Sequence, residues 1–394
     1  MTWIRRNMFR SVGDSIVSIA VAALAGYVIW QLFQFIFITG RWEIIEVNLK
    51  LLLVGRFPEE LMWMLGASII ALAFWIGAVA ASSTRDSTKS KSIGMALLDV
   101  FTRFGLIIAL GVVIIALAGS LEALLVGLGV VLAILVGRAV GTARRKLPLL
   151  SKIPWIIWQL LLVLTPTILI LQTLLVSELE EWGGFLINVY IAIISIVLAF
   201  PLGVLLALGR KSSLPIIRLI STTYIELVRG APLFVLLLLA GVALEFFIPS
   251  EIAPGATFRA ITVFTMFTAA YLAEIIRGGL QSISKGQTEA GKALGLPTVK
   301  IIFLITLPQA LRNVIPAQIG QFISLFKDTT LAGAALSMLE LLKVGEAITK
   351  QDAYLGQGLV YESLGFVALL FWVGSYVMSR ESQRLEKKLG VGIR

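Results

Sequence analysis

The sequence predicts an all-α, polytopic membrane protein with about ten transmembrane helices and with both termini in the cytoplasm. Hydrophobic residues make up 58% of its 394 residues and charged residues only 14%. In soluble domains about 45–50% of the residues are apolar and roughly 25% are charged. The mean hydropathy is +0.95. This much apolar side chain cannot be buried inside a water-soluble body of this size, so a bilayer must cover part of it.

Cysteine and histidine are both absent. Their absence excludes disulfides, zinc fingers and a Ser-His-Asp triad. The net charge of +10 is typical of a membrane protein whose cytoplasmic loops are rich in Lys and Arg. We therefore expect the lipid bilayer as a partner and no nucleic acid.

A spanning helix needs about 20 mostly apolar residues. Apolar runs of this kind lie at 14–38, 60–82, 96–118, 121–141, 153–176, 185–209, 222–248, 259–277, 311–337 and 360–379. Basic residues gather in 83–92, 142–148, 210–218 and 285–312 and in the carboxyl tail, on one predicted side of the bilayer. Few lie on the other side, so the positive-inside rule predicts cytoplasmic termini.

The segment 43–56 is too short and too polar to span. Glu43, Glu46 and Lys50 share one helical face, and an apolar stripe of Ile45 and Leu49 lies opposite. This pattern predicts an amphipathic helix in the outer interface. A buried loop helix is the alternative.

A predicted cytoplasmic segment, 278–310, differs from the other loops. Ser284 followed by Gln287 is a capping-box pattern, and Gly295 followed by Pro297 is a stop signal. These signals predict a short, slender helix at 285–294 that projects from the membrane and docks into a partner. The alternative is an ordinary loop helix on the bilayer surface.

Glu289-Ala290-Gly291, then Gly295 and, nine residues later, Ile305-Thr306-Leu307-Pro308 are similar to the EAA loop of ABC-importer permeases. The spacing agrees without a gap, and Gly291 stands where that loop usually has Ala. Further segments resemble the polar, or general L-, amino-acid branch of the family: 182–210, 224–235 (with Ala231 for the usual Thr), 269–287 and 307–332. The residues before 182 resemble, in layout, the extra spans of the longer permease of broad-specificity amino-acid importers.

The resemblance implies a permease subunit in a bacterial inner membrane. It divides the chain into an N-terminal extension, 1–181, with about five extra spans and the interfacial helix, and a core permease domain, 182–394, with five spans and the coupling helix 285–294. The implied partners are a second permease in a heterodimer, two ATP-binding subunits, an extracytoplasmic substrate-binding protein and an amino-acid substrate. The residues implied in ATPase coupling are Glu289, Ala290, Gly291, Gly295, Leu296 and Pro308.

No phosphate-cradling loop is present, because 208–212 (LGRKS) does not meet the P-loop pattern. The chain is therefore not expected to be an enzyme or to hold a cofactor. ATP and Mg would be bound by the partner ATPase.

Gln321, Ser324 and Asp328 lie at i, i+3 and i+7 and so share one helix face. Ionisable groups inside spans are costly and suggest function. Asp328 could pair with a substrate ammonium, and the two neutral side chains could hydrogen-bond the substrate. Alternatively, the stripe holds permease subunits together. The other substrate-pathway candidates are Thr268, Tyr271 and Leu233.

Glu226 with Arg229, and Glu274 with Arg277, repeat an i, i+3 spacing that predicts structural salt bridges near the interface. Gly230 and Pro232 should break the seventh span, and a broken helix can expose backbone groups to substrate.

With Asp328 as the only acid of the stripe, we expect neutral, polar or acidic amino acids rather than cationic ones. Two other classes of function make different demands on the sequence. A stand-alone, ion-coupled secondary transporter would need inverted repeats and coupling carboxylates, and an intramembrane enzyme would need a pair of mid-span catalytic groups.

Overall fold

The computed structural model describes residues 8–83, 93–146, 154–249 and 253–390, and no β-strand forms in these ranges. Two isolated bridges join Gly55 to Trp182 and Gly184 to Glu340. The basic loop predicted at 83–92 and the end of that at 142–148 lie outside the described residues.

The first half of the chain folds into long apolar helices joined by short ones: α2 (Val12–Gln34), continued by the π-helix η1 (Phe35–Thr39), then α3 (Glu43–Val47), α4 (Leu49–Val54), η2 (Glu59–Leu61), α5 (Met62–Ser83), α6 (Ile93–Ala118), α7 (Leu121–Lys146), α9 (Trp155–Val176) and η3 (Leu179–Glu181).

The second half begins with α10 (Gly184–Arg210), α11 (Pro215–Gly230), α12 (Leu233–Leu238), η4 (Leu239–Ala243), α13 (Leu244–Phe247), α14 (Ala256–Ser282) and α15 (Lys285–Ala293). It continues with α16 (Thr298–Ile301), η5 (Ile302–Thr306), α17 (Leu307–Asn313), α18 (Ile315–Asp328), α19 (Leu331–Leu336), α20 (Leu341–Ile348) and α21 (Val360–Leu389).

Within the described residues, six helices are long and apolar enough to cross a membrane, or eight if each of two bent pairs is one span. The predicted count of ten is therefore not confirmed. Helices α6 and α9 do form at the third and fifth predicted spans, where the shorter apolar stretches Gly105–Ala118 and Pro166–Val176 are recorded.

Two predicted spans are bent. The run 222–248 folds as α11 and then α12 with η4, which meet at 101°. Ala231 has extended backbone angles (φ −93°, ψ 139°) because the ring of Pro232 disfavours a helical conformation in the preceding residue. The run 311–337 bends by 61° between α17 and α18, beside Pro316, and its helix ends at Asp328.

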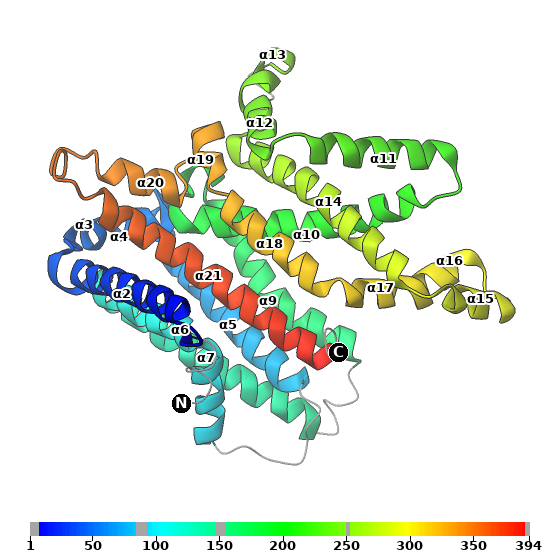
Figure 1. Ribbon diagram of the computed structural model, residues 1–394, viewed down its shortest axis with the longest axis horizontal. Coiled ribbons are helices and arrows are strands. Elements are labelled where there is room, and N and C mark those ends of the chain that lie inside the picture. Colours follow the sequence, from blue (N-terminus) through cyan, green and yellow to red (C-terminus); the bar gives the residue numbers. More distant parts are fainter. Residues whose placement is uncertain (1–7, 84–92, 147–153, 250–252, 391–394) are drawn as a thin grey trace.

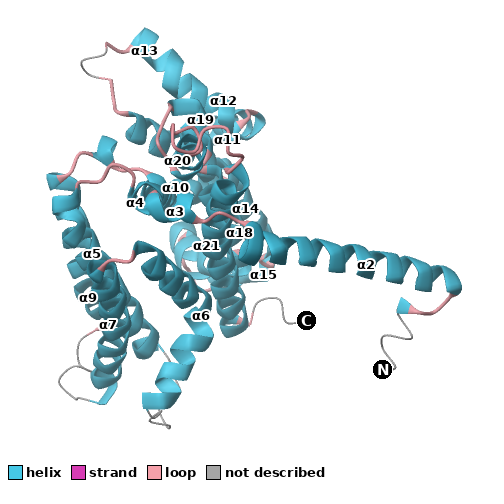
Figure 2. Cartoon of the chain, turned by 90° about the vertical axis from the view of Figure 1, so that its left-hand side faces the viewer, coloured by secondary structure: helices cyan, strands magenta, loops and turns pink. Residues whose placement is uncertain are grey.

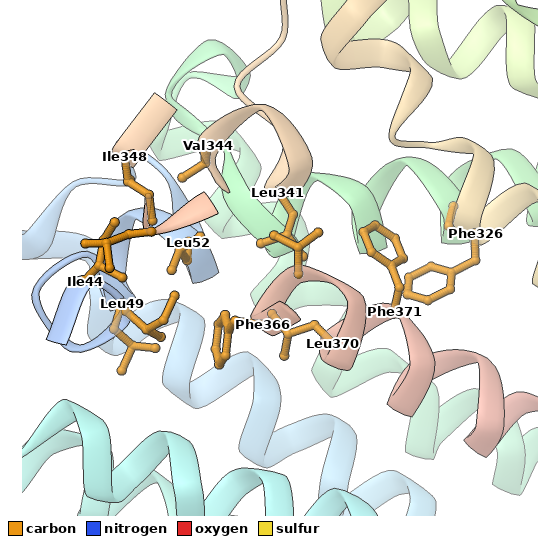
Figure 3. Close-up of a cluster of buried hydrophobic side chains, with 14 residues drawn as sticks. Ile44, Leu49, Leu52, Phe326, Leu341, Val344, Ile348, Phe366, Leu370 and Phe371 are labelled. Carbon is orange, nitrogen blue, oxygen red and sulfur yellow. The ribbon is translucent and has the colours of Figure 1, made fainter. Parts of the chain in front are cut away.

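The segment predicted as an interfacial helix has a protein partner. It forms α3 and α4, and its apolar residues pack into a cluster with α20 and α21. Figure 3 shows Ile44, Leu49 and Leu52 beside Val344, Ile348 and Phe366. The structure therefore favours the alternative, a buried helix that joins the two halves of the chain.

Helix α2 leaves this body as a single long helix (Figure 2), and none of its residues is buried in the chain. In Figure 1, α14, α18 and α21 run in similar diagonal directions past α10, with α15 and α16 at one end of these helices and α20 near the other. The end with α15 is the one that the charge distribution predicts to be cytoplasmic, and we call it the inner end.

Candidate functional site

The predicted helix 285–294 corresponds to α15, which ends at Ala293. Gly295 has φ +74°. Its N–H donates to the Lys292 carbonyl (2.9 Å), and the Leu296 N–H donates to the Gly291 carbonyl (3.1 Å). These two bonds form a Schellman motif, which a residue in the left-handed region makes possible. Glycine reaches that region at no steric cost.

The start of α15 differs from the prediction. The Ser284 side chain makes no capping hydrogen bond, and the Gln287 N–H donates to the Ser284 backbone carbonyl at 3.1 Å. The Gln287 side chain instead accepts a long hydrogen bond, 3.4 Å, from Gln309 in α17. The capping box of the sequence is therefore not formed.

The two faces of α15 are unlike. Gly291 is buried, and a Cβ there would lie 2.9 Å from Cγ1 of Ile301. The missing side chain of this glycine therefore lets α15 pack closely against α16. Glu289 and Ala290 are exposed on the outside, and Leu294 is 78% exposed. The exposed face thus carries one acid and small or apolar side chains.

The remaining residues predicted to take part in ATPase coupling follow α15 in the chain. Leu296 is half-buried, and Pro308 is exposed at the start of α17. The π-helix η5 directly precedes α17. Proline cannot donate the hydrogen bond that a regular helix would need there, so the helix is irregular at this place.

The two predicted salt bridges belong to one ion network of Arg210, Glu226, Arg229, Glu274 and Arg277. Arg277 bonds both carboxylate oxygens of Glu274, as its i, i+3 spacing predicted. Glu226 pairs with Arg210 at 2.7 Å instead of with Arg229, and Arg210 also reaches Glu274 at 3.2 Å. The pairing predicted between Glu226 and Arg229 is therefore wrong.

Arg210 was missed as a partner because it lies 16 residues before Glu226 and 64 before Glu274. Only the packing of α10 against α11 and α14 brings these side chains together. The network therefore ties three helices to one another near the inner end.

The pathway candidates fall into two groups. Gln321, Ser324 and Asp328 are half-buried on α18 and make no hydrogen bond or ion pair with any residue that the structure describes. Tyr271 is also half-buried, and its ring lies 4.8 Å from that of Phe267. Polar groups left open in this way are available to a ligand or a second subunit.

Thr268 and Leu233 lie inside the chain. Thr268 is fully buried on α14, and its hydroxyl finds no partner among the described residues. Leu233 packs in the apolar cluster that contains Ile187 and Phe264. Neither side chain faces open space in this conformation.

One polar site escaped the sequence analysis. At the other end of the bundle, Glu340 is 1% exposed and Asn188 and Thr329 are fully buried. The Asn188 amide donates to Glu340 (3.2 Å) and to Thr329 (2.9 Å), and the Leu341 N–H donates to Asn188 at 2.9 Å. We call this cluster the junction. Its one signal in the sequence was the isolated carboxamide of Asn188 in an apolar run.

The junction also caps α20. Glu340 accepts hydrogen bonds from the backbone N–H groups of Leu342 (2.9 Å) and Lys343 (2.8 Å). Burial raises the pKa of Glu340, and these hydrogen bonds partly oppose that effect. Next to it, the Gly184 N–H donates to the Leu339 carbonyl and the Gly183 N–H to the Val54 carbonyl, so the N-terminal half is tied to the same place.

The family described as the inner membrane component of binding-protein-dependent transport systems matches residues 199–390. A probable glutamine ABC transporter permease of Bacillus subtilis, GlnP, is 37% identical over 52% of this chain and 91% of its own length. The chain belongs to this permease family.

Two further relatives are longer than GlnP and match about half of this chain. An inner membrane amino-acid ABC transporter permease of Escherichia coli K12, YhdY, is 40% identical over 55% of the chain and 58% of the relative. A glutamate/glutamine/aspartate/asparagine transport system permease of Rhodobacter capsulatus, BztC, is 43% identical over 53% of the chain and 48% of the relative. The permease thus matches about half the length of these two relatives.

Proposed function

We propose that this permease is the translocation subunit of an ATP-driven amino-acid importer. The observation that carries the proposal is α15: a short helix with an exposed outer face, fixed in place by Gly291 and ended by the Schellman motif at Gly295. Family membership supports it, because the matched family serves binding-protein-dependent transport.

In this proposal, residues 182–394 form the translocation domain together with a second permease, and residues 1–181 are an extension. Two ATP-binding subunits hold ATP and Mg and dock against α15 around Glu289 and Ala290. A substrate-binding protein delivers the amino acid at the opposite end. The chain itself hydrolyses nothing.

The two bent pairs suggest where the permease moves. A helix interrupted at Pro232 or near Pro316 has lost backbone hydrogen bonds at the break, so its two parts can change angle at a lower cost than an unbroken helix. Closure of the ATPases would pull on α15, and α17 would pass that motion to α18, whose polar stripe of Gln321, Ser324 and Asp328 would line the pathway.

The substrates in this proposal are neutral, polar or acidic amino acids. The names of the relatives refer to glutamine, glutamate, aspartate and asparagine. A dry cavity for a cationic side chain would need a second acid to balance it, and Asp328 is the only acid of the stripe. If arginine outcompeted glutamine and glutamate for uptake by the wild-type importer, this assignment would be wrong.

The coupling role of α15 is tested by Gly295→Val in the complete importer reconstituted in vesicles. Valine at φ +74° costs more than about 1 kcal/mol, so the end of α15 must change. We expect ATP-driven uptake and substrate-stimulated ATPase activity to fall several-fold while the amount of permease in the membrane stays normal.

The matched control is Gly26→Val in α2. An added Cβ meets no atom within 4 Å at either glycine, but Gly26 has no left-handed backbone angle and lies outside α15. The control should retain uptake. Unchanged transport in Gly295→Val would rule out the docking role, and a purified permease that never retains an ATPase would rule out the importer.

A further inference from the structure

Arg229 is the member of the ion network whose hydrogen-bond donors are left unused. Arg277 bonds both oxygens of Glu274, and Arg210 bonds Glu274 and Glu226. Arg229 reaches Glu274 only at 3.8 Å, too far for a hydrogen bond. Three guanidinium groups thus face two carboxylates, which leaves one positive charge in excess.

The surroundings of Arg229 hold its guanidinium in place without satisfying it. The guanidinium carbon lies 5.4 Å from the centroid of the Tyr271 ring, a cation–π distance. Its Nε is buried and has no acceptor among the described residues. The side chain as a whole is 32% exposed, so a ligand can reach it.

Arg218 and Arg312 of the second half make no ion pair with a described residue, but both are exposed to solvent. Water satisfies an exposed guanidinium. A partly desolvated cation with unused donors is costly and gains most from an oxyanion, which a guanidinium binds through two parallel hydrogen bonds.

We propose that Arg229, positioned by Tyr271, binds the α-carboxylate of the transported amino acid near the inner end of the pathway. This inference rests on the proposed import of amino acids. Every amino acid carries an α-carboxylate, and Arg229 offers a planar pair of donors that a carboxylate can accept. Arg229 lies two residues before the break at Ala231 and Pro232, so a change in the angle between α11 and α12 would move it and release the carboxylate.

The test uses the permease with its second permease and ATPases, in nanodiscs and without the binding protein. Calorimetric titration with L-glutamine and with its α-amide measures how strongly the complex prefers the carboxylate. The wild type should prefer glutamine. Arg229→Gln should weaken glutamine binding about tenfold or more and leave binding of the α-amide unchanged, so the preference disappears.

Arg218→Gln is the matched control, because it removes the same charge from an exposed position of the same helix, and it should keep the wild-type preference. Arg229→Lys keeps the charge but not the planar pair of donors, and it should lose part of the preference. This second variant decides the question if Arg229→Gln fails to assemble with the ATPases.

Two results would overturn the inference. One is an unchanged preference for glutamine over its α-amide in both Arg229 variants. The other is a defect of Arg229→Gln that occurs with phosphatidylglycerol in the nanodisc and vanishes in phosphatidylcholine alone, which would assign the site to a lipid phosphate. If the wild-type importer showed no ATP-driven uptake of any amino acid, the proposed function itself would be overturned.

Discussion

The helices of the N-terminal half and those of the second half are held together by different interactions. In the N-terminal half, α5 and α7 touch through glycine: a Cβ on Gly77 would lie 2.4 Å from the Ile134 carbonyl oxygen, and one on Gly137 would lie 2.2 Å from that of Phe74. In the second half, a network of charges and a junction of buried polar groups supplement the apolar contacts.

The difference fits what each half has to do. Association of helices in lipid gains little from the hydrophobic effect, so close backbone approach through small residues is a simple way to build a rigid unit. Polar groups between helices hold them as well, but they also bind ligands and allow more than one arrangement. We therefore expect the first half to move as a unit and the second half to contain the moving parts.

The largest effect should come from Glu340→Ala at the junction. The change leaves the Leu342 and Lys343 N–H groups without their side-chain acceptor and removes one of the two acceptors of the Asn188 amide. Buried donors left unpaired cost about 1–3 kcal/mol each. We expect destabilisation of about 3 kcal/mol or more and easier proteolysis near α20. Glu340→Gln keeps one accepting oxygen and should lose less. Wild-type stability in both variants would show that the junction does not stabilise the fold.

Gly137→Val should have the next largest effect. Its new side chain meets the backbone of α5 instead of a mobile side chain, so the helices must separate, at a cost of about 1–3 kcal/mol. We expect α5 and α7 to lose contact, measured by cross-linking of cysteine pairs in a chain that has no cysteine of its own. The control is Gly111→Val, since a Cβ at Gly111 meets no atom within 4 Å.

The smallest effect should be a pH dependence at the junction. Burial holds the pKa of Glu340 above its ordinary value, so the folded state binds its proton more tightly than the unfolded state does. Stability should therefore fall as the pH rises from the ordinary pKa of a glutamate through the raised one. Thermal unfolding of the wild type and of Glu340→Gln at several pH values measures this term, which should be missing from the variant. A steeper dependence in the variant would contradict it.

Local sequence patterns predicted those features that depend on neighbouring residues. The Gly295 and Pro297 stop signal placed the end of α15 within a residue, because a left-handed glycine is a local requirement. The pair of Glu274 and Arg277 followed from their spacing along one helix. The break at Pro232 followed from proline chemistry, although its angle did not.

Predictions from local sequence patterns were wrong where the partner of a residue comes from a distant part of the chain. Ile45 and Leu49 were assigned to the membrane interface because their face is apolar, and the sequence does not reveal that α20 and α21 cover that face. Glu226 was paired with its neighbour Arg229, and the junction partner of Asn188 lies 152 residues away at Glu340.

The sequence by itself determined that this protein is a helical membrane protein and that a short helix ends beside Gly295, since composition, periodicity and capping are properties of short segments. The tertiary structure alone decided which charges pair and which remain open. Arg210 takes the carboxylates that Arg229 would otherwise hold, because the packing of α10 against α11 and α14 places its guanidinium closer to both acids. That choice leaves Arg229 with a 3.8 Å ion pair to Glu274 and with no hydrogen-bond acceptor among the residues that the structure describes.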